Sequence, residues 1–164
     1  FYDPFKPNGS DIALGIRRVD SLESLFSQCD IVTLHLPLNK ETEKLIDRTV
    51  LNHAKPGLVL INTARGPIVD IDALYDAMRA DRVLAAGLDV LPEEPANLDK
   101  PLIKAWQEEA DWIKHRLLIT PHSAFFTPQS MFDIRSFSAQ TAAKYITTGR
   151  LENCVNQDML TFQR

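Results

Sequence analysis

Residues 58–90 read LVLINTARGPIVDIDALYDAMRADRVLAAGLDV. The apolar run at residues 58–62 predicts a buried strand, and apolar residues at helical spacing predict a helix over residues 70–81. A second apolar run within residues 83–90 predicts the next strand. Strand, helix and strand in this order form a parallel βαβ unit, so the stretch predicts an α/β fold with a parallel sheet.

The same alternation continues on both sides of this unit. Further strands are expected at residues 1–2, 16–19, 31–36 and 117–120. Further helices are expected at residues 21–29, 42–53 and 127–148. Asp20 suits the N-cap of the first of these helices, and Gly149 is a stop signal for the last.

Residues 96–116 stand apart from this alternation as an inserted segment. Its apolar residues fall on one stripe at helical spacing, which predicts a surface helix; they are Leu102, Ile103, Trp106, Ala110 and Ile113. Two interpretations stay open, a lid or partner contact and an extra helix packed on the domain.

Composition excludes several classes of function. The chain has 164 residues, 45% of them hydrophobic, and a net charge of −4, so it can bury one core and lacks the basic surface of a nucleic-acid binder. No apolar run reaches the roughly 20 residues of a membrane span. Cys29 and Cys154 are far apart in sequence and form no metal-binding pattern, so we expect reduced thiols, a cytoplasmic protein and no metal site.

Three charged or polar residues each follow a strand-like apolar run. Arg65 ends INTAR, Glu94 ends GLDVLPEE, and His122 ends ITPH. Because parallel strands deliver side chains to the crevice at their carboxyl ends, we expect these three to meet there. A guanidinium can bind a carboxylate with two hydrogen bonds, and a histidine backed by a carboxylate can act as general acid or base. The trio therefore predicts a site for a small carboxylate substrate.

Two longer blocks make the chain resemble the D-2-hydroxyacid dehydrogenase family, the D-isomer specific 2-hydroxyacid dehydrogenases. Residues 54–70 read AKPGLVLINTARGPIVD. An upstream block carries Leu25-Phe26, Cys29-Asp30-Ile31-Val32, Leu34-His35, Pro37, Thr42, Leu45 and Asp47. The resemblance implies a Rossmann-type domain, NAD as cofactor, and hydride transfer between NAD(H) and a 2-oxo or 2-hydroxy acid. It also implies a homodimer.

The same resemblance implies catalytic roles for the trio. Arg65 would bind the substrate carboxylate, and His122 would exchange a proton with the substrate oxygen. Glu94 would orient the imidazole and stabilise its protonated form; Glu93 competes for this role, but Glu94 directly precedes a proline, as the family acid does. Phe125 and Phe126 would either exclude water from the substrate or simply pack in a core.

Cofactor-binding roles follow from the resemblance as well. Asp3 would bind the adenosine ribose and favour NAD over NADP, and Asp89 would bind the nicotinamide carboxamide unless it is only a capping residue. Thr42 would both cap its helix and contact the cofactor. The other expected cofactor contacts are His35, Leu36, Pro37, Thr63, Ala64 and Ala124.

The expected domain is incomplete. The glycine-rich phosphate loop of the family, with its first βα unit, would lie upstream of Tyr2, and the six glycines form no such pattern. We therefore interpret residues 1–164 as a partial dinucleotide-binding domain without the substrate domain, a fragment of a longer enzyme. Without the first strand, residues 31–36 would form an exposed sheet edge. We expect the chain alone to have little activity, weak NADH affinity and a tendency to associate.

Two alternatives to a dehydrogenase stay open at this point. The strings FYDPF at residues 1–5 and NCVN at residues 153–156 also resemble the C-terminal binding protein corepressors, which are NADH-responsive regulators with the same trio. The second alternative is a catalytically inert fragment that serves in packing or interaction.

Overall fold

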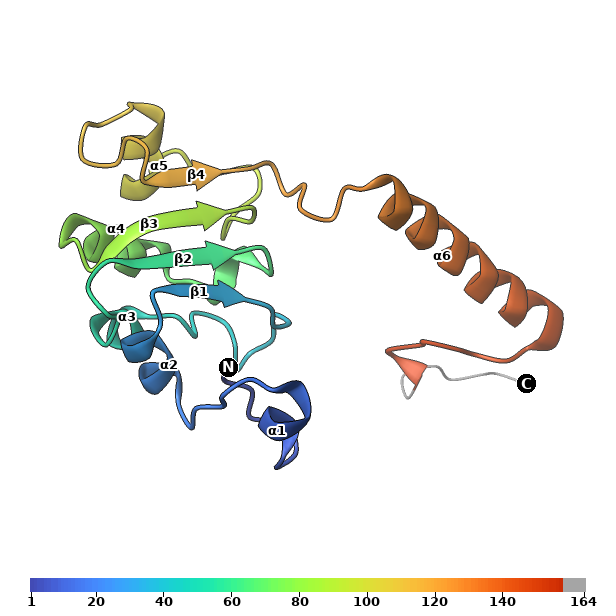
Figure 1. Ribbon diagram of the computed structural model, residues 1–164. Coiled ribbons are helices and arrows are strands. Elements are labelled where there is room, and N and C mark those ends of the chain that lie inside the picture. The colour runs from blue at the N-terminus through green and yellow to red at the C-terminus, as the bar shows by residue number, and fades with distance from the viewer. Residues whose placement is uncertain (158–164) are drawn as a thin grey trace. The chain divides into compact units, whose positions relative to one another are not determined.

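The computed structural model describes residues 1–157 and divides the chain into two compact units, Phe1–Ala124 and Phe125–Arg164. The first unit is an α/β domain built on a four-stranded parallel sheet (Figure 1). Its strands are β1 (Ile31–Leu34), β2 (Leu58–Asn62), β3 (Val83–Leu88) and β4 (Leu117–Ile119). They lie side by side in chain order, so the predicted fold class is confirmed.

The helices of the first unit follow the predicted alternation with shifted boundaries. They are α1 (Ser10–Leu14), α2 (Leu22–Gln28), α3 (Arg48–Asn52), α4 (Ile71–Arg79) and α5 (Pro101–Gln107), with a 3₁₀ turn, η1 (Gly66–Ile68). Asp70 caps α4 by accepting hydrogen bonds from the backbone N–H groups of Asp72 and Ala73. Ser21, rather than the predicted Asp20, caps α2 by accepting from the N–H of Ser24.

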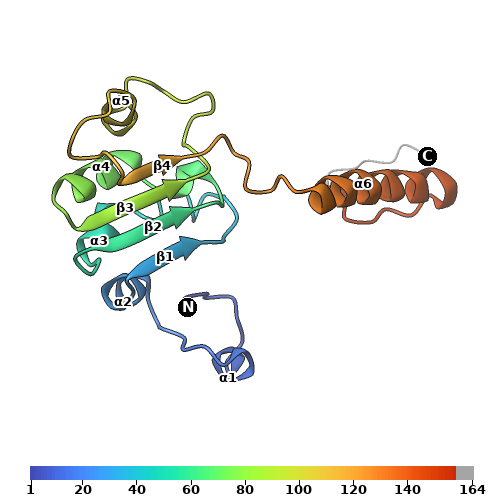
Figure 2. The ribbon, with the colours of Figure 1, turned by 45° about the horizontal axis from the view of Figure 1, so that its top comes forward.

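The domain core lies between the sheet and the row of helices α2, α3, α4 and α5 (Figure 2). Strand residues alternate between buried and more exposed positions, as a sheet covered on one face requires. The buried side chains from the strands include Val32, Leu34, Leu58, Leu60, Ala86 and Leu88. Apolar residues on the opposite face, among them Ile31, Leu84 and Leu118, are more than half exposed.

The predicted strands at residues 1–2 and 16–19 are wrong. The two segments contact each other: the Phe1 amino group donates to the Arg17 carbonyl, and the Val19 N–H donates to the Phe1 carbonyl. The Arg18 guanidinium donates to the carbonyls of Asp3 and Lys6. These contacts do not connect either segment to the four-stranded sheet, and neither segment forms a strand.

The predicted helix over residues 42–53 is too long. The Ile46 N–H donates to the Ile68 carbonyl, and the Asp70 N–H donates to the Ile46 carbonyl, so residue 46 pairs with the loop after β2. This pairing competes with helix formation, and α3 begins only after Asp47, whose carboxylate accepts from the Val50 N–H. Thr42 is therefore not the N-cap of the helix.

The segment 96–116 contains a helix that is shorter than its apolar stripe. Helix α5 ends at Gln107, and Glu109 adopts a left-handed backbone conformation with φ of 49°. The chain then turns, so that Leu102, Ile103 and Ile113 are all buried in the core although only the first two are in α5.

The second unit contains α6 (Pro128–Thr148), which confirms the predicted long helix. Thr127 and Ser130 form a reciprocal capping box at its start, and Gly149 ends it with φ of 68°. Within residues 1–157, no helix combines the length and apolar character that crossing a membrane requires.

Candidate active site

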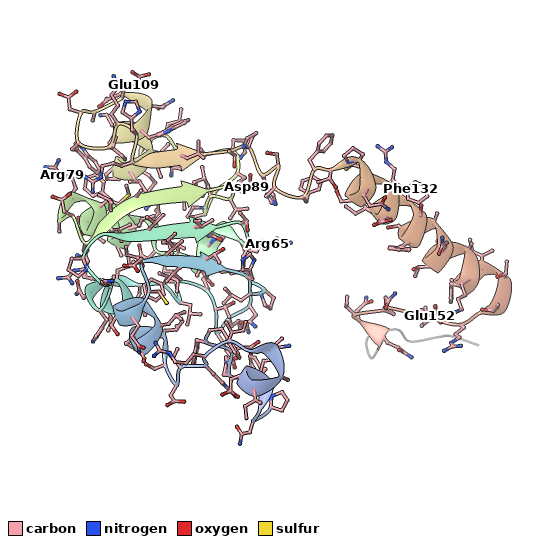
Figure 3. All side chains as sticks on the ribbon, in the orientation of Figure 1. Arg65, Arg79, Asp89, Glu109, Phe132 and Glu152 are labelled. Carbon is pink, nitrogen blue, oxygen red and sulfur yellow. The ribbon has the colours of Figure 1, made fainter. Side chains whose placement is uncertain are left out.

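The predicted site residues, apart from Asp3, follow the carboxyl ends of the four strands. Figure 3 places Arg65 and Asp89 at the same end of the sheet, beyond β2 and β3, whereas Arg79 lies at the other end. His35, Leu36 and Pro37 follow β1, Thr63 and Ala64 follow β2, and His122 and Ala124 follow β4. A parallel sheet brings all of these loops to one edge, where α/β domains bind their ligands.

Glu94 and His122 are in direct contact in this site. The Nδ1 atom of His122 lies 2.8 Å from Oε2 of Glu94, and the Leu91 N–H donates to Oε1 of the same carboxylate. Glu93 instead accepts hydrogen bonds from the Asn97 side chain. The hydrogen bond with His122, followed by that from Leu91, lowers the pKa of Glu94 below its ordinary value. Glu94 is therefore a carboxylate near neutral pH, suited to orient an imidazole.

Asp89 holds the turn that carries His122. Asp89 is only 6% exposed. Its carboxylate accepts hydrogen bonds from the Thr120 hydroxyl and from the N–H groups of Ser123 and Ala124. Burial acts to raise the pKa of Asp89, but these hydrogen bonds outweigh it and lower the pKa. His122 itself has φ of 50°, a left-handed conformation that costs free energy in a non-glycine residue. The Asp89 contacts stabilise that conformation.

Asn62 plays the corresponding part for Arg65. The Asn62 side chain, 1% exposed at the end of β2, donates to the Arg65 carbonyl and accepts from the Ala64 N–H. Within residues 1–157, Asn62 and Asp89 are the two polar residues that are buried. The sequence pattern did not single out Asn62; its place at the end of an apolar run, where a polar side chain must find partners, was the available signal.

Gly66 lets the Arg65 loop approach the Glu94 loop. A Cβ atom on Gly66 would lie 2.0 Å from the carbonyl carbon and oxygen of Leu91 and 2.5 Å from the nitrogen of Pro92. Only glycine permits this approach, because real Cβ atoms do not come so near to backbone. Arg65 is exposed beside this contact, and its guanidinium donates to the Ala64 carbonyl.

The remaining predicted cofactor residues lie in turns. Asp3 accepts a hydrogen bond from the Phe5 N–H, as an aspartate at the start of a turn does. The Thr42 hydroxyl donates to the Pro37 carbonyl, which fastens the loop after β1. The Thr33 hydroxyl lies 2.9 Å from Nε2 of His35. These side chains thus stabilise local turns, and their contact with a cofactor stays a prediction.

A family model covers most of the chain. It is the model of the D-isomer specific 2-hydroxyacid dehydrogenase NAD binding domain, and it matches residues 1–124. The chain belongs to the D-isomer specific 2-hydroxyacid dehydrogenase family. The matched residues coincide with the first structural unit, whose parallel sheet and strand-end loops are those of an NAD-binding domain.

Relatives within the family support the assignment. The chain is 34% identical to D-3-phosphoglycerate dehydrogenase of Archaeoglobus fulgidus over 155 residues, which are 94% of this chain and 28% of that protein. A solved D-lactate dehydrogenase with NAD+ from Lactobacillus jensenii is 31% identical, with a TM-score of 0.75 over 95% of this chain and 47% of that one. A glyoxylate reductase structure from Paecilomyes thermophila is 27% identical, with a TM-score of 0.78 over 96% of this chain and 44% of that one. The chain therefore spans about a quarter to a half of these family members.

The strand-end loops suit NAD, the cofactor of the matched domain. The loops after β1, β2, β3 and β4 meet at one sheet edge, the edge at which parallel α/β sheets bind dinucleotides. Gly66 brings two of these loops together, and the buried Asn62 and Asp89 fix their conformations. No described residue contradicts binding of the cofactor at this edge.

Proposed function

We propose that the protein containing this chain interconverts 2-oxo acids and 2-hydroxy acids with NAD(H). The observation that carries this proposal is the 2.8 Å contact between His122 Nδ1 and Glu94 Oε2 at the sheet edge where Arg65 also lies. This arrangement combines an imidazole able to carry a proton with a cation able to bind a carboxylate. Family membership and NAD as cofactor agree with it.

Each member of the trio has a defined task in this reaction. Bound NADH supplies the hydride that C2 of the substrate receives. Arg65 binds the substrate carboxylate with its planar guanidinium and so orients C2. Protonated His122 gives its proton to the C2 oxygen, which completes the 2-hydroxy acid, and it takes the proton back in the reverse direction. Glu94 keeps the imidazole oriented and stabilises its charged form.

The cofactor would lie along the strand-end loops. We assign its adenosine ribose to Asp3 and its nicotinamide end to the loops that contain Thr63, Ala64, Asp89 and Ala124. The loop after β1, with His35, Leu36 and Pro37 fastened by Thr42, would line the middle of the site. A carboxylate at residue 3 repels a 2′-phosphate, which favours NAD over NADP.

The decisive experiment measures NADH oxidation by the full product of the gene that encodes this chain, with glyoxylate and pyruvate as substrates. His122→Asn should lower kcat by about 100-fold or more, since general acid catalysis contributes about 10² to 10⁴. Arg65→Ala should raise KM for the 2-oxo acid and lower kcat/KM. His53→Asn is the matched control: His53 ends α3, bonded to the Thr49 carbonyl, and should keep full activity.

A separate measurement of NADH binding shows whether a variant has lost catalysis or cofactor binding. His122→Asn should bind NADH as tightly as the unchanged protein does, which NADH fluorescence measures. If the protein binds NADH but does not oxidise it when any of the 2-oxo acids is added, the result would contradict the proposal. It would then favour the NADH-responsive regulator.

The assembly and location of the protein complete the proposal. We expect a homodimer, as implied by family resemblance, and light scattering of the full gene product would test it. The free thiols of Cys29 and Cys154 suit a reducing compartment, so we expect the protein in the cytoplasm.

A further inference from the structure

The segment 96–116 begins directly after the Glu94 loop, residues 91–95, and packs on α4. Helices α4 and α5 lie side by side in the first unit (Figure 2), and Ile71 of α4 and Ile103 of α5 are both buried. Both line a cavity of only about 10 Å³, together with Leu91 of the Glu94 loop. A volume of this size holds at most about one water molecule, so the loop packs closely against the starts of both helices.

Three polar residues that line the same cavity connect the loop to α4; they are Glu93, Asn97 and Lys100. The Asn97 side chain donates to both carboxylate oxygens of Glu93, at 3.2 and 3.3 Å. The Lys100 N–H donates to the Asn97 carbonyl, and Lys100 Nζ lies 2.7 Å from Oδ2 of Asp72 in the first turn of α4. A continuous series of contacts therefore runs from α4 to the residue that precedes Glu94.

The charges along this series favour the connection. The hydrogen bond from Lys100 to Asp72, followed by the charge of Asp72, raises the pKa of Lys100. Glu93 and Asp70 act in the same direction through their charges. Lys100 is thus a cation attracted both to the start of α4 and to the Glu94 loop. Because its ion pair is exposed, the pair contributes little to stability, and its role lies in where it holds the loop.

The position of the Glu94 loop decides the contact with His122. Oε2 of Glu94 lies 2.8 Å from Nδ1 of His122, and Oε1 accepts from the Leu91 N–H of the same loop. The Glu94 side chain is 41% exposed, so neighbouring side chains enclose it only in part. Hydrogen bonds span a narrow range of distances, so a shift of the loop by about 0.5 Å would weaken this contact.

We propose that Asn97 and Lys100 are positioning residues that fasten the Glu94 loop to the start of α4. By doing so, they hold the carboxylate of this loop against the imidazole of His122. The effect on the reaction rests on the proposed function, whereas the effect on the loop does not. In this role the segment 96–116 is an extra helix packed on the domain, and its first residues support the catalytic pair.

The first test removes the hydrogen bond to Glu93 without a change of charge. Asn97→Ala in the full gene product should lower kcat for glyoxylate or pyruvate by about 3- to 10-fold, less than the roughly 10²-fold that a displacement of 1 Å can cost. Because a looser carboxylate stabilises protonated His122 less, kcat/KM for reduction should also begin to fall at a lower pH. The carboxylates of Glu94 and Asp89, which both act on His122, remain in this variant.

Asn52→Ala is the matched control. Asn52 is the exposed last residue of α3, so this variant should change neither kcat nor the pH profile. NADH affinity should be the same in both variants and in the unchanged protein, because neither asparagine lies in a loop assigned to the cofactor.

Further variants identify the partner through which Asn97 acts. Asn97→Asp keeps the acceptor for the Asp99 N–H but loses the donor to Glu93, so it should lose at least as much activity as Asn97→Ala. Glu93→Gln keeps an oxygen that accepts from Asn97 and should lose much less activity than Glu93→Ala. If both residues act through one hydrogen bond, the double variant Glu93→Ala and Asn97→Ala should lose no more than either single variant.

Lys100 is tested in the same way. Lys100→Met should lower kcat and shift the pH profile in the same direction as Asn97→Ala, and Lys100→Arg should restore most of the activity because it keeps the charge. Lys104→Met is the matched control in the same helix. Lys104 pairs with Glu108 on the surface at 3.9 Å, so this variant should keep full activity.

Hydrogen exchange measures the connection without depending on turnover. The Leu91 N–H, which donates to Glu94, should exchange faster in Asn97→Ala and in Lys100→Met than in the unchanged protein. Its exchange should be unchanged in Asn52→Ala and in Lys104→Met.

The outcomes separate the two proposals. Unchanged exchange at Leu91, or a lower kcat with an unmoved pH profile, would overturn the positioning role and leave the proposed function standing. Absence of turnover of 2-oxo acids by the unchanged protein would overturn the proposed function. Exchange at Leu91 would then still decide whether Asn97 and Lys100 hold the Glu94 loop.

Discussion

Two buried polar side chains hold the reactive loops of this site in place. Asn62 ends β2 and binds both sides of the Arg65 loop, and Asp89 follows β3 and binds the turn of His122. A buried polar group without partners costs about 1–3 kcal/mol, so each loop is held to the conformation that satisfies its partner. The orientation of the exposed, reactive residues is thus fixed by residues that are themselves buried.

At Gly66, the missing side chain is the functional feature. Gly66→Ala should lower the free energy of unfolding by about 1–3 kcal/mol, because the added Cβ would meet the Leu91 carbonyl at 2.0 Å and rigid backbone must move. It should also lower kcat/KM, since the loops of Arg65 and Glu94 would separate. Denaturant unfolding and steady-state kinetics measure the two effects.

Gly87→Ala is the matched control for that substitution. Gly87 lies in β3, and an added Cβ would meet no atom within 4 Å. Stability should be unchanged or slightly higher, because alanine restricts the unfolded chain. Equal losses of unfolding free energy in Gly66→Ala and Gly87→Ala would refute the role of the close approach between Gly66 and Leu91.

The Glu94–His122 contact should give stability a distinct pH dependence. The pKa of Glu94 is lower in the folded state than its ordinary value of 4.5. Its contribution is therefore fully present above about pH 4.5 and lost as the pH falls through the lowered folded value. The difference in unfolding free energy between the unchanged protein and Glu94→Gln should accordingly shrink toward zero under acid conditions. The effect should be small, since the Glu94 side chain is 41% exposed.

Unfolding curves from pH 7 to pH 3 measure this difference. Glu93→Gln serves as the control, because Glu93 bonds to Asn97 and not to His122. If the difference in unfolding free energy between Glu94→Gln and the unchanged protein stays constant from pH 7 to pH 3, the Glu94 carboxylate does not stabilise the fold in the expected way.

At the scale of the element, helix α3 depends on Asp47 for its start. Asp47→Ala should lower the free energy of unfolding by about 1 kcal/mol, because the Val50 N–H loses its side-chain acceptor. Thr42→Ala should instead loosen the loop after β1, where the Thr42 hydroxyl donates to the Pro37 carbonyl. Hydrogen exchange distinguishes the two, since Asp47→Ala should speed exchange in α3 and Thr42→Ala should not. Faster exchange in α3 of Thr42→Ala, but not of Asp47→Ala, would contradict the role of Asp47 as the cap.

At the scale of the whole molecule, the sheet of the first unit has one exposed apolar face. Parallel sheets are normally covered on both faces, yet Ile31, Leu84 and Leu118 are more than half exposed there. β1 is also an edge strand, in agreement with the expectation from the sequence. We therefore expect the 164-residue chain, studied alone, to bind hydrophobic dyes and to associate.

The double substitution Leu84→Thr and Leu118→Thr tests this expectation. Threonine has a β-branched side chain, which suits a strand, but it offers less apolar surface than leucine, so dye binding and association should both decrease. Leu98→Thr is the control, because Leu98 is 54% exposed but lies outside the sheet. Dye fluorescence and light scattering measure the outcome, and a monomeric chain that binds no dye would contradict the prediction.

The sequence by itself determined the strands β1 to β4, helices α4 and α6, and the family. Apolar runs with helical or strand-like spacing reflect burial directly, and the contiguous block AKPGLVLINTARGPIVD identifies the domain. The local signal of Gly149 predicted the end of α6 correctly, since capping involves only neighbouring residues. The predicted N-cap of α2, Asp20, was one residue too early, because Ser21 caps that helix.

Only the tertiary structure decided the features that depend on distant partners. The pairing of Ile46 with the loop after β2 shortened α3. The close approach of Gly66 to Leu91 and the hydrogen bonds of Asp89 with Thr120, Ser123 and Ala124 also join segments far apart in sequence. Periodicity reports which residues are buried, but not against what, so these contacts became visible only in the folded chain.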